Sequence, residues 1–193
     1  MTDKNQSVVN GMSPSARNSV YANSAIVTQV KAEDFAYLTA EYGVLAGLEF
    51  QRRFEHAARQ NGGDGQIAPA QRVTDFVAGR KSTSLPATSY IPGITSSDMA
   101  GWMPEFIHRS LRAGISDFGR RMKGFLSADA AVIGVESRTS TPVRIPRNAD
   151  TLMHVQIKGL FPSGEGAGYA GGIISAALDG QRAADAAAAY LTR

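Results

Sequence analysis

The sequence predicts a mixed α/β (α+β) fold, and three observations support this. Short runs rich in β-branched residues alternate with longer segments whose apolar residues recur at helical spacing. Near the C-terminus, a glycine-rich loop leads into an alanine-rich helix. The chain has 193 residues, 43% hydrophobic and 19% charged, which is enough for one large domain or two small ones.

Composition narrows the classes of function. The net charge of +3 arises from 20 Lys and Arg against 17 Asp and Glu, well mixed along the chain, so we expect no nucleic-acid partner. The chain has no cysteine, which excludes disulfides and thiolate metal sites and favours a cytoplasmic protein. We expect no signal peptide and no membrane span, because no apolar stretch is long enough. The three histidines are far apart, so we expect no metal site.

The N-terminal half predicts one strand and two helices after a polar arm at residues 1–24. Asn23–Val30, "NSAIVTQV", is typical of a strand. Val44–Gln60 has apolar residues near helical spacing, and the glycines of Asn61–Gly65 end that helix in a loop. Pro69–Gly79 predicts a second helix, with proline in its first turn and glycine at its end.

The second half predicts two more helices and three strands. Arg80–Asp98 is a long loop, and loops of this length are often functional. Met103–Met122 has a helical apolar stripe that Gly114 is expected to interrupt. Ala130–Arg147 predicts two strands joined by a polar turn, and Met153–Phe161 a further weak strand. The last helix starts at Ile173.

The glycine-rich segment is the strongest candidate for a binding site. "GAGYAG" spells GxGxxG, and five of the nine residues from Gly164 to Gly172 are glycine. Glycine lets another group approach the backbone, and the unpaired N–H groups at the start of the following helix attract an anion or an electron-rich oxygen. A complete Rossmann site would also need a second strand that ends in an acidic residue about 20 positions on, and here the predicted helix continues in place of that strand. Residue chemistry alone leaves a ligand loop and a close-packed structural turn both open.

Several residues in or near the glycine-rich segment can also be explained either by ligand binding or by a structural role. Glu165 would repel a pyrophosphate but could accept hydrogen bonds from sugar or ribityl hydroxyls, or from the loop itself. Arg138, Arg144 and Arg147 surround a turn and could bind an anionic substrate or phosphate, or simply be solvated. Tyr169 could line a substrate pocket or pack. No GxSxG motif is present, and the sequence points to no catalytic residue.

Longer stretches resemble a family of bacterial FAD-dependent dehydrogenases, or NAD(P)/FAD-dependent oxidoreductases. The stretches are "NGMSPSARNSVYANSAIV", "LAGLEFQRRFEHAA", "APAQRVTDFVAGR", "GVESRTSTPVRIPR" and "GLFPSGEGAGYAGGIISAALDG", in the order that the family shows. The resemblance implies the C-terminal portion of a two-domain FAD/NAD(P)-binding flavoprotein fold. Residues 1–24 would be an arm, 25–150 a substrate or cap domain, and 151–193 a returning segment of the FAD-binding domain.

The resemblance also implies a cofactor, FAD, and a set of contacts for it. Gly164 and Glu165 would meet the ribityl region, Gly166 and Gly168 would continue the loop, and Gly171, Gly172 and Ile173 would offer N–H groups to the flavin N1/O2 edge. Family members carry an N-terminal ADP-binding half that this sequence lacks, so that half is an expected partner, in cis or as a separate chain. The substrate would be an unknown small molecule.

Two alternatives remain beside this interpretation. The chain could be a non-catalytic remnant or subunit that needs a separate flavin-binding chain. It could also be an autonomous nucleotide-binding module that uses the glycine loop alone. If the chain is one part of a larger assembly, surfaces that pack on the remainder should expose apolar side chains.

Overall fold

The computed structural model describes residues 4–11 and 14–192. They form a mixed α/β fold, as the sequence predicted, with a small mixed sheet and five α-helices among these residues. The chain divides into two compact units. The first contains residues 1–34 and 51–137, and the second contains residues 35–50 and 138–193. In the described ranges no helix combines the length and the apolar character that crossing a membrane requires.

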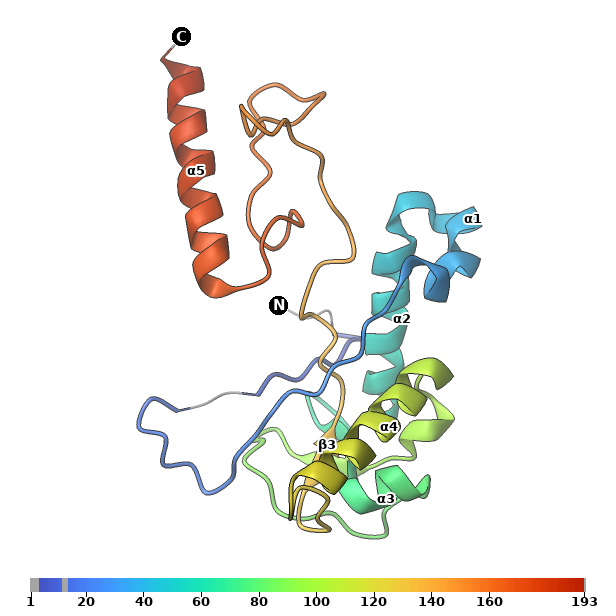
Figure 1. Cartoon of the computed structure of the whole chain (residues 1–193). Helices are drawn as coiled ribbons and strands as arrows, with labels where there is room; N and C mark the ends of the chain where they lie inside the picture. The colour runs from blue at the N-terminus through green and yellow to red at the C-terminus, as the bar shows by residue number, and fades with distance from the viewer. Residues whose placement is uncertain (1–3, 12–13, 193) are drawn as a thin grey trace. The chain divides into compact units, whose positions relative to one another are not determined.

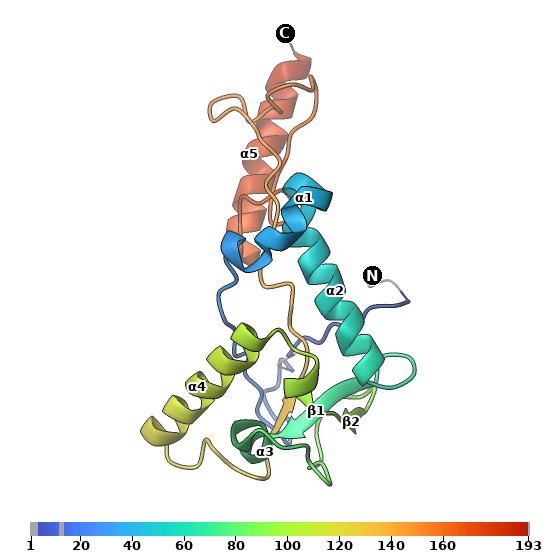
Figure 2. The same ribbon diagram turned by 90° about the vertical axis from the view of Figure 1, so that its right-hand side faces the viewer.

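The first unit is built on a three-stranded sheet of order β2-β1-β3, with β1 (Ala68–Arg72) in the centre. β2 (Ile94–Ser96) runs parallel to β1, with Ala68 opposite Ile94. β3 (Ala131–Ile133) runs antiparallel, with Ala70 opposite Ile133. Figure 2 shows β1 beside β2 and leading directly into α3.

Three helices of the first unit enclose its core. They are α3 (Val73–Ala78), α4 (Glu105–Arg121) and the part of α2 (Ala46–Asn61) that follows Phe50. Phe76 and Met99 are the largest apolar side chains that are completely buried. The buried core cluster consists of Ala58, Val73, Phe76, Met99, Met103, Ile115 and Val135. Apolar residues from all three helices therefore join in one buried cluster.

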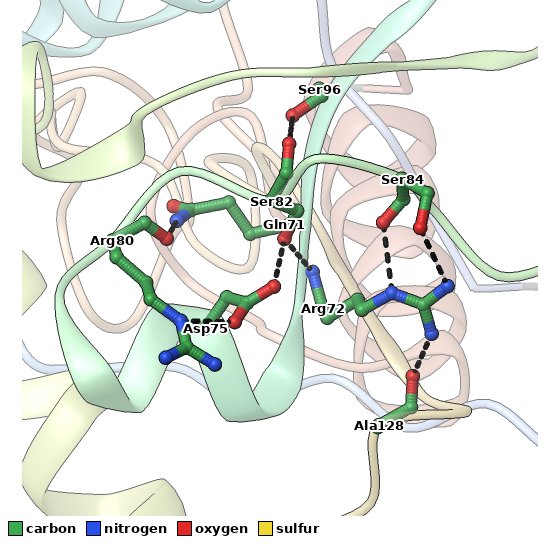
Figure 3. A network of polar contacts seen from close by, with 8 residues as sticks. All are labelled: Gln71, Arg72, Asp75, Arg80, Ser82, Ser84, Ser96 and Ala128. Atoms are coloured by element: carbon green, nitrogen blue, oxygen red, sulfur yellow. Dashed lines mark hydrogen bonds and ion pairs between the residues drawn. The ribbon is translucent and has the colours of Figure 1, made fainter.

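A buried polar network fixes the loop that follows α3 (Figure 3). The Gln71 amide donates to the Arg80 carbonyl at 2.7 Å, and its oxygen accepts the Met99 N–H at 2.9 Å. Asp75 accepts hydrogen bonds from Arg80 at 2.6 Å and from the Ser82 hydroxyl at 2.8 Å. These bonds hold the start of the long loop against β1 and α3.

The second unit contains α1 (Thr39–Tyr42), the first residues of α2, and α5 (Ile173–Leu191). Residues 138–172 have no regular strand and contain one isolated bridge, between Arg147 and His154. Figure 1 shows α5 as one long helix that follows this irregular segment. The Phe161 ring packs edge-on against Tyr190 of α5, with centroids 6.0 Å apart.

Several predicted elements are confirmed. The helix predicted at Val44–Gln60 is α2, although Val44 lies before it and is exposed. The helix predicted at Met103–Met122 is α4, and Gly114 does not interrupt it because Ile107 and Ile115 on either side are anchored in the interior. The helix predicted from Ile173 is α5.

Other predicted elements are wrong. Asn23–Val30 forms no strand, because no neighbouring strand pairs with it and β-branched residues alone do not make a ladder. The helix predicted from Pro69 begins only at Val73, since the small residues before it are buried in the central strand. The loop predicted at Arg80–Asp98 contains β2. Of the strands predicted in Ala130–Arg147 and Met153–Phe161, only β3 forms.

Candidate functional site

An ion pair fixes the glycine-rich loop within the second unit. Arg147 lies before the loop and Asp179 lies in the second turn of α5. Arg147 Nη2 lies 2.6 Å from Asp179 Oδ1, and Arg147 Nη1 lies 2.9 Å from Asp179 Oδ2. Both side chains are buried, with 9% and 10% of their surface exposed. This two-pronged geometry is the strongest form of an arginine–carboxylate contact.

The same pair also holds the backbone at the start of the loop. Arg147 Nη1 donates to the Pro162 carbonyl at 2.7 Å, and the Gly164 N–H donates to Asp179 Oδ2 at 2.9 Å. The hydrogen bonds from Arg147 and from the Gly164 N–H lower the pKa of Asp179 to about 2. The hydrogen bond to Asp179 raises the pKa of Arg147 above its usual range. The loop therefore starts from a position that charge and hydrogen bonds fix together.

A tight turn follows at Gly164–Tyr169. The Gly168 N–H donates to the Glu165 carbonyl at 2.9 Å, and the Tyr169 N–H donates to the Gly164 carbonyl at 3.0 Å. Gly168 has φ +82°, and a Cβ there would lie 2.7 Å from the Val143 carbonyl oxygen and 3.1 Å from Arg144 Cα. Only glycine allows this backbone approach without displacement. Packing of the chain thus accounts for Gly168.

Tyr169 lies against two of the arginines predicted to bind anions. The Arg147 guanidinium carbon is 3.7 Å from the centre of its ring, and that of Arg144 is 4.4 Å. The Tyr169 hydroxyl donates to the Ile145 carbonyl at 3.0 Å. Cation–π contacts of this kind attract the guanidinium groups to the ring face. Arg144 is exposed despite this contact, and Arg138 is also exposed.

The loop ends at Gly172, the N-cap of α5. The Gly172 N–H donates to Ser175 Oγ at 3.1 Å, and the first helical bond joins the Ala176 N–H to the Gly172 carbonyl at 2.8 Å. Among the described residues, no acceptor faces the N–H groups of Gly171 and Ile173. Ile173 is 89% exposed. The positive end of the α5 dipole is thus open to solvent.

Two further loop residues leave space for a ligand. A Cβ at Gly166 or Gly171 would meet no atom within 4 Å. Glu165 is exposed, and no side-chain partner among the described residues engages its carboxylate. The loop is thus packed at Gly164 and Gly168 and open at Glu165, Gly166 and Gly171.

Sequence reasoning missed the central pair of this site. The sequence offers Arg147 as one of three arginines around a turn and gives no sign that Asp179 is its partner. The available signal was Asp179, an acidic residue one turn after Ser175 in the first, mostly small and apolar half of α5. An acidic residue in that setting is stable only with a buried cation beside it.

Large apolar side chains of the second unit are exposed in this chain. Those of α5 are Ile173, Ile174, Leu178, Tyr190 and Leu191, and those of the segment before the loop are Ile145, Val155, Ile157 and Leu160. Folded monomers seldom expose so many large aliphatic residues close together in sequence.

Comparison with known proteins gives two findings. A family model described as "FAD-dependent protein, C-terminal domain-like" matches residues 1–139. An uncharacterized protein of Clostridium beijerinckii is 42% identical over 186 residues, a match that covers 95% of this chain and 34% of that protein. The chain thus spans about a third of the length of this curated relative. The family match ends before the glycine loop, and the similarity to the relative extends through it.

Proposed function

Since the chain belongs to the FAD-dependent protein, C-terminal domain-like family, we propose that it forms the flavin-contacting C-terminal segment of an oxidoreductase. In this proposal, the loop at residues 164–173 contacts the ribityl and pyrimidine parts of FAD. The observation that carries it is the start of α5, which is open to solvent and directly follows a glycine loop fixed by Arg147 and Asp179.

The start of α5 fits the pyrimidine edge of a flavin. The free N–H groups of Gly171 and Ile173 could donate to the flavin N1 and O2 atoms. A reduced flavin gains negative charge near these atoms, and the positive end of a helix dipole stabilises it. The flavin itself would carry the hydride, and the chain would hold it and tune its potential. Gly172 already donates to Ser175, so its N–H would serve only if it exchanged that exposed partner.

The first half of the loop fits the ribityl chain. Glu165 is exposed and can accept hydrogen bonds from hydroxyl groups. Gly166 has no side chain, so a ligand can approach its backbone. The Gly164 N–H is used by Asp179, so Gly164 would contribute a left-handed turn, with φ +70°, rather than a hydrogen bond. Arg144 and Tyr169 would face the rest of the FAD molecule or an anionic substrate.

We further propose that a second polypeptide region completes the flavin site. The relative is about three times as long as the matched segment, which leaves room for an ADP-binding half. The exposed Ile173, Ile174 and Leu178 are suited to packing against that half. It would be supplied in the same chain or as a separate subunit, and in the latter case this chain is the non-catalytic partner.

The test is to titrate FAD into this chain mixed with the separately produced unmatched part of the Clostridium relative, and to follow backbone amide resonances. We expect saturable shifts at Gly171 and Ile173 and retention of flavin after gel filtration. Gly171→Ala should weaken both, because its Cβ enters free space that a flavin edge would occupy. Gly114→Ala, which also adds a Cβ in free space, should not. Absence of retained flavin and of loop shifts in the mixture would refute the proposal.

A further inference from the structure

A polar pocket lies in the first unit, away from the glycine loop in the sequence. Its volume is about 430 Å³, within the usual range for small-molecule sites. Its walls come from the end of α2, the start of the long loop, β2 and the residues after β2. The lining residues include Gln60, Asn61, Lys81, Ser97, Asp98 and Trp102.

Buried hydrogen bonds hold two walls of this pocket in place. Lys81 lies between Arg80, whose carbonyl accepts from Gln71, and Ser82, whose hydroxyl donates to Asp75. Gln71, only 1% exposed, also accepts the Met99 N–H next to Asp98. The Ser96 hydroxyl donates to the Ser82 carbonyl at 2.5 Å. Figure 3 shows the bonds that join Gln71 to Arg80, Asp75 to Ser82 and Ser82 to Ser96. A site fixed in this way loses little entropy when a ligand binds.

An aromatic wall is fixed as well. The Trp102 indole N–H donates to the Ser97 hydroxyl at 2.9 Å, and the Phe54 ring lies 5.9 Å from the Trp102 ring between centroids. These contacts fix the plane of the indole, and the apolar face of an indole packs well against the C–H face of a sugar ring.

The polar side chains of the pocket keep hydrogen-bonding capacity for a ligand. Among the described residues, no side chain or backbone group forms a hydrogen bond or ion pair with the Gln60 amide, the Lys81 ammonium or the Asp98 carboxylate. Asn61 donates to the Ala57 carbonyl, which leaves its amide oxygen as an acceptor. The pocket thus offers both donors and acceptors, with one cation and one anion that balance each other.

We propose that this pocket binds a neutral polyhydroxylated ligand of about the size of a monosaccharide. Hydroxyl groups donate and accept, so they can use the amide, carboxylate and ammonium groups together. Lys81 would attract an anion and Asp98 would repel it. For a cation, Asp98 would attract it and Lys81 would repel it. The charges of the pocket therefore favour neither kind of ion. Binding here does not require a flavin.

The test uses the whole chain and its single tryptophan. D-glucose, D-galactose and D-ribose are titrated separately, and the indole N–H resonance of Trp102 is followed together with the amides of residues 95–98. We expect a saturable shift with at least one sugar. Asp98→Asn should weaken the binding about tenfold, because a hydrogen bond to a charged group is lost. Asp129→Asn, an equal change at an exposed residue outside the pocket, should leave the affinity unchanged.

Two outcomes would overturn the proposal. The first is that none of the three sugars gives a saturable shift at Trp102 or residues 95–98. The second is that serine, a zwitterion tested in the same way, saturates the pocket while the sugars do not, because paired charges would then select the ligand. Neither outcome affects the flavin proposal, whose readouts are retained flavin and the amides of Gly171 and Ile173.

Discussion

Arg147 and Asp179 are 32 residues apart in the sequence and meet through two hydrogen bonds of 2.6 and 2.9 Å. Asp179 also accepts the Gly164 N–H, and Arg147 also donates to the Pro162 carbonyl. One buried pair therefore fixes both the entry of the glycine loop and the helix that follows it. The position of the open N-terminus of α5 therefore depends on these two side chains.

The first prediction is that Asp179→Ala destabilises the second unit by about 3 kcal/mol. The change leaves the Arg147 guanidinium buried without its counter-charge and removes the acceptor of the Gly164 N–H. The measurement is the free energy of opening from amide hydrogen exchange at Gly164 and along α5. Fluorescence is unsuitable, because the only tryptophan is in the first unit.

A matched change on α4 serves as the control. Asp117 pairs with Arg120 at 2.9 Å and Arg121 at 2.7 Å, and both arginine side chains are largely exposed. Asp117→Ala should cost less than about 1 kcal/mol, as exposed ion pairs usually do. Equal costs for the two variants would contradict a structural role for the buried pair.

The second prediction concerns pH. The pKa of Asp179 is lowered to about 2 in the folded chain, against an ordinary value of 3.8. Its contribution to the free energy of unfolding is therefore complete above about pH 4 and is lost as the pH falls through about 2. The expected loss is about 2 kcal/mol. Carboxyl carbon resonances give the titration midpoint, and Asp179→Asn should remove this part of the pH dependence. A midpoint near 4 for Asp179 would refute the prediction.

The sequence predicted the long helices well and the strands poorly. α2, α4 and α5 have apolar or small residues in a pattern that local spacing reveals. β1 is a central strand in which three of the five residues are alanine or proline, which have low strand propensity. It forms because β2 and β3 pair with both of its edges, and pairing partners distant in sequence leave no local signal.

In the candidate site, too, local features were predictable from the sequence and contacts between distant residues were not. The glycine loop and the start of α5 were predictable, because turn residues and helix starts are encoded locally. The pairing of Arg147 with Asp179 was not, because it depends on how residues 138–172 fold back onto α5. The contacts of Tyr169 with Arg144 and Arg147 depend on the same path.

The third prediction separates packed glycines from open ones. Gly168→Ala should destabilise the second unit by more than about 1 kcal/mol, because φ is +82° and the new Cβ would lie 2.7 Å from the Val143 oxygen. Gly166→Ala should change stability little, because its Cβ meets no atom within 4 Å. Hydrogen exchange at the Gly168 N–H and along α5 compares the two. If Gly166→Ala cost as much as Gly168→Ala, the close approach would not explain the glycine.

The fourth prediction tests the network beneath the polar pocket. Gln71→Leu leaves the Met99 N–H and the Arg80 carbonyl without partners in a buried setting, so we expect a loss of about 2 kcal/mol. Urea unfolding followed by Trp102 fluorescence measures it, because Trp102 packs on the same core. Gln29→Leu removes an equal amide from an exposed residue of the same unit and should be neutral. Because Gln71 joins the segments that carry Lys81 and Asp98, its loss should also weaken sugar binding, whereas a pocket fixed by other contacts would keep its affinity.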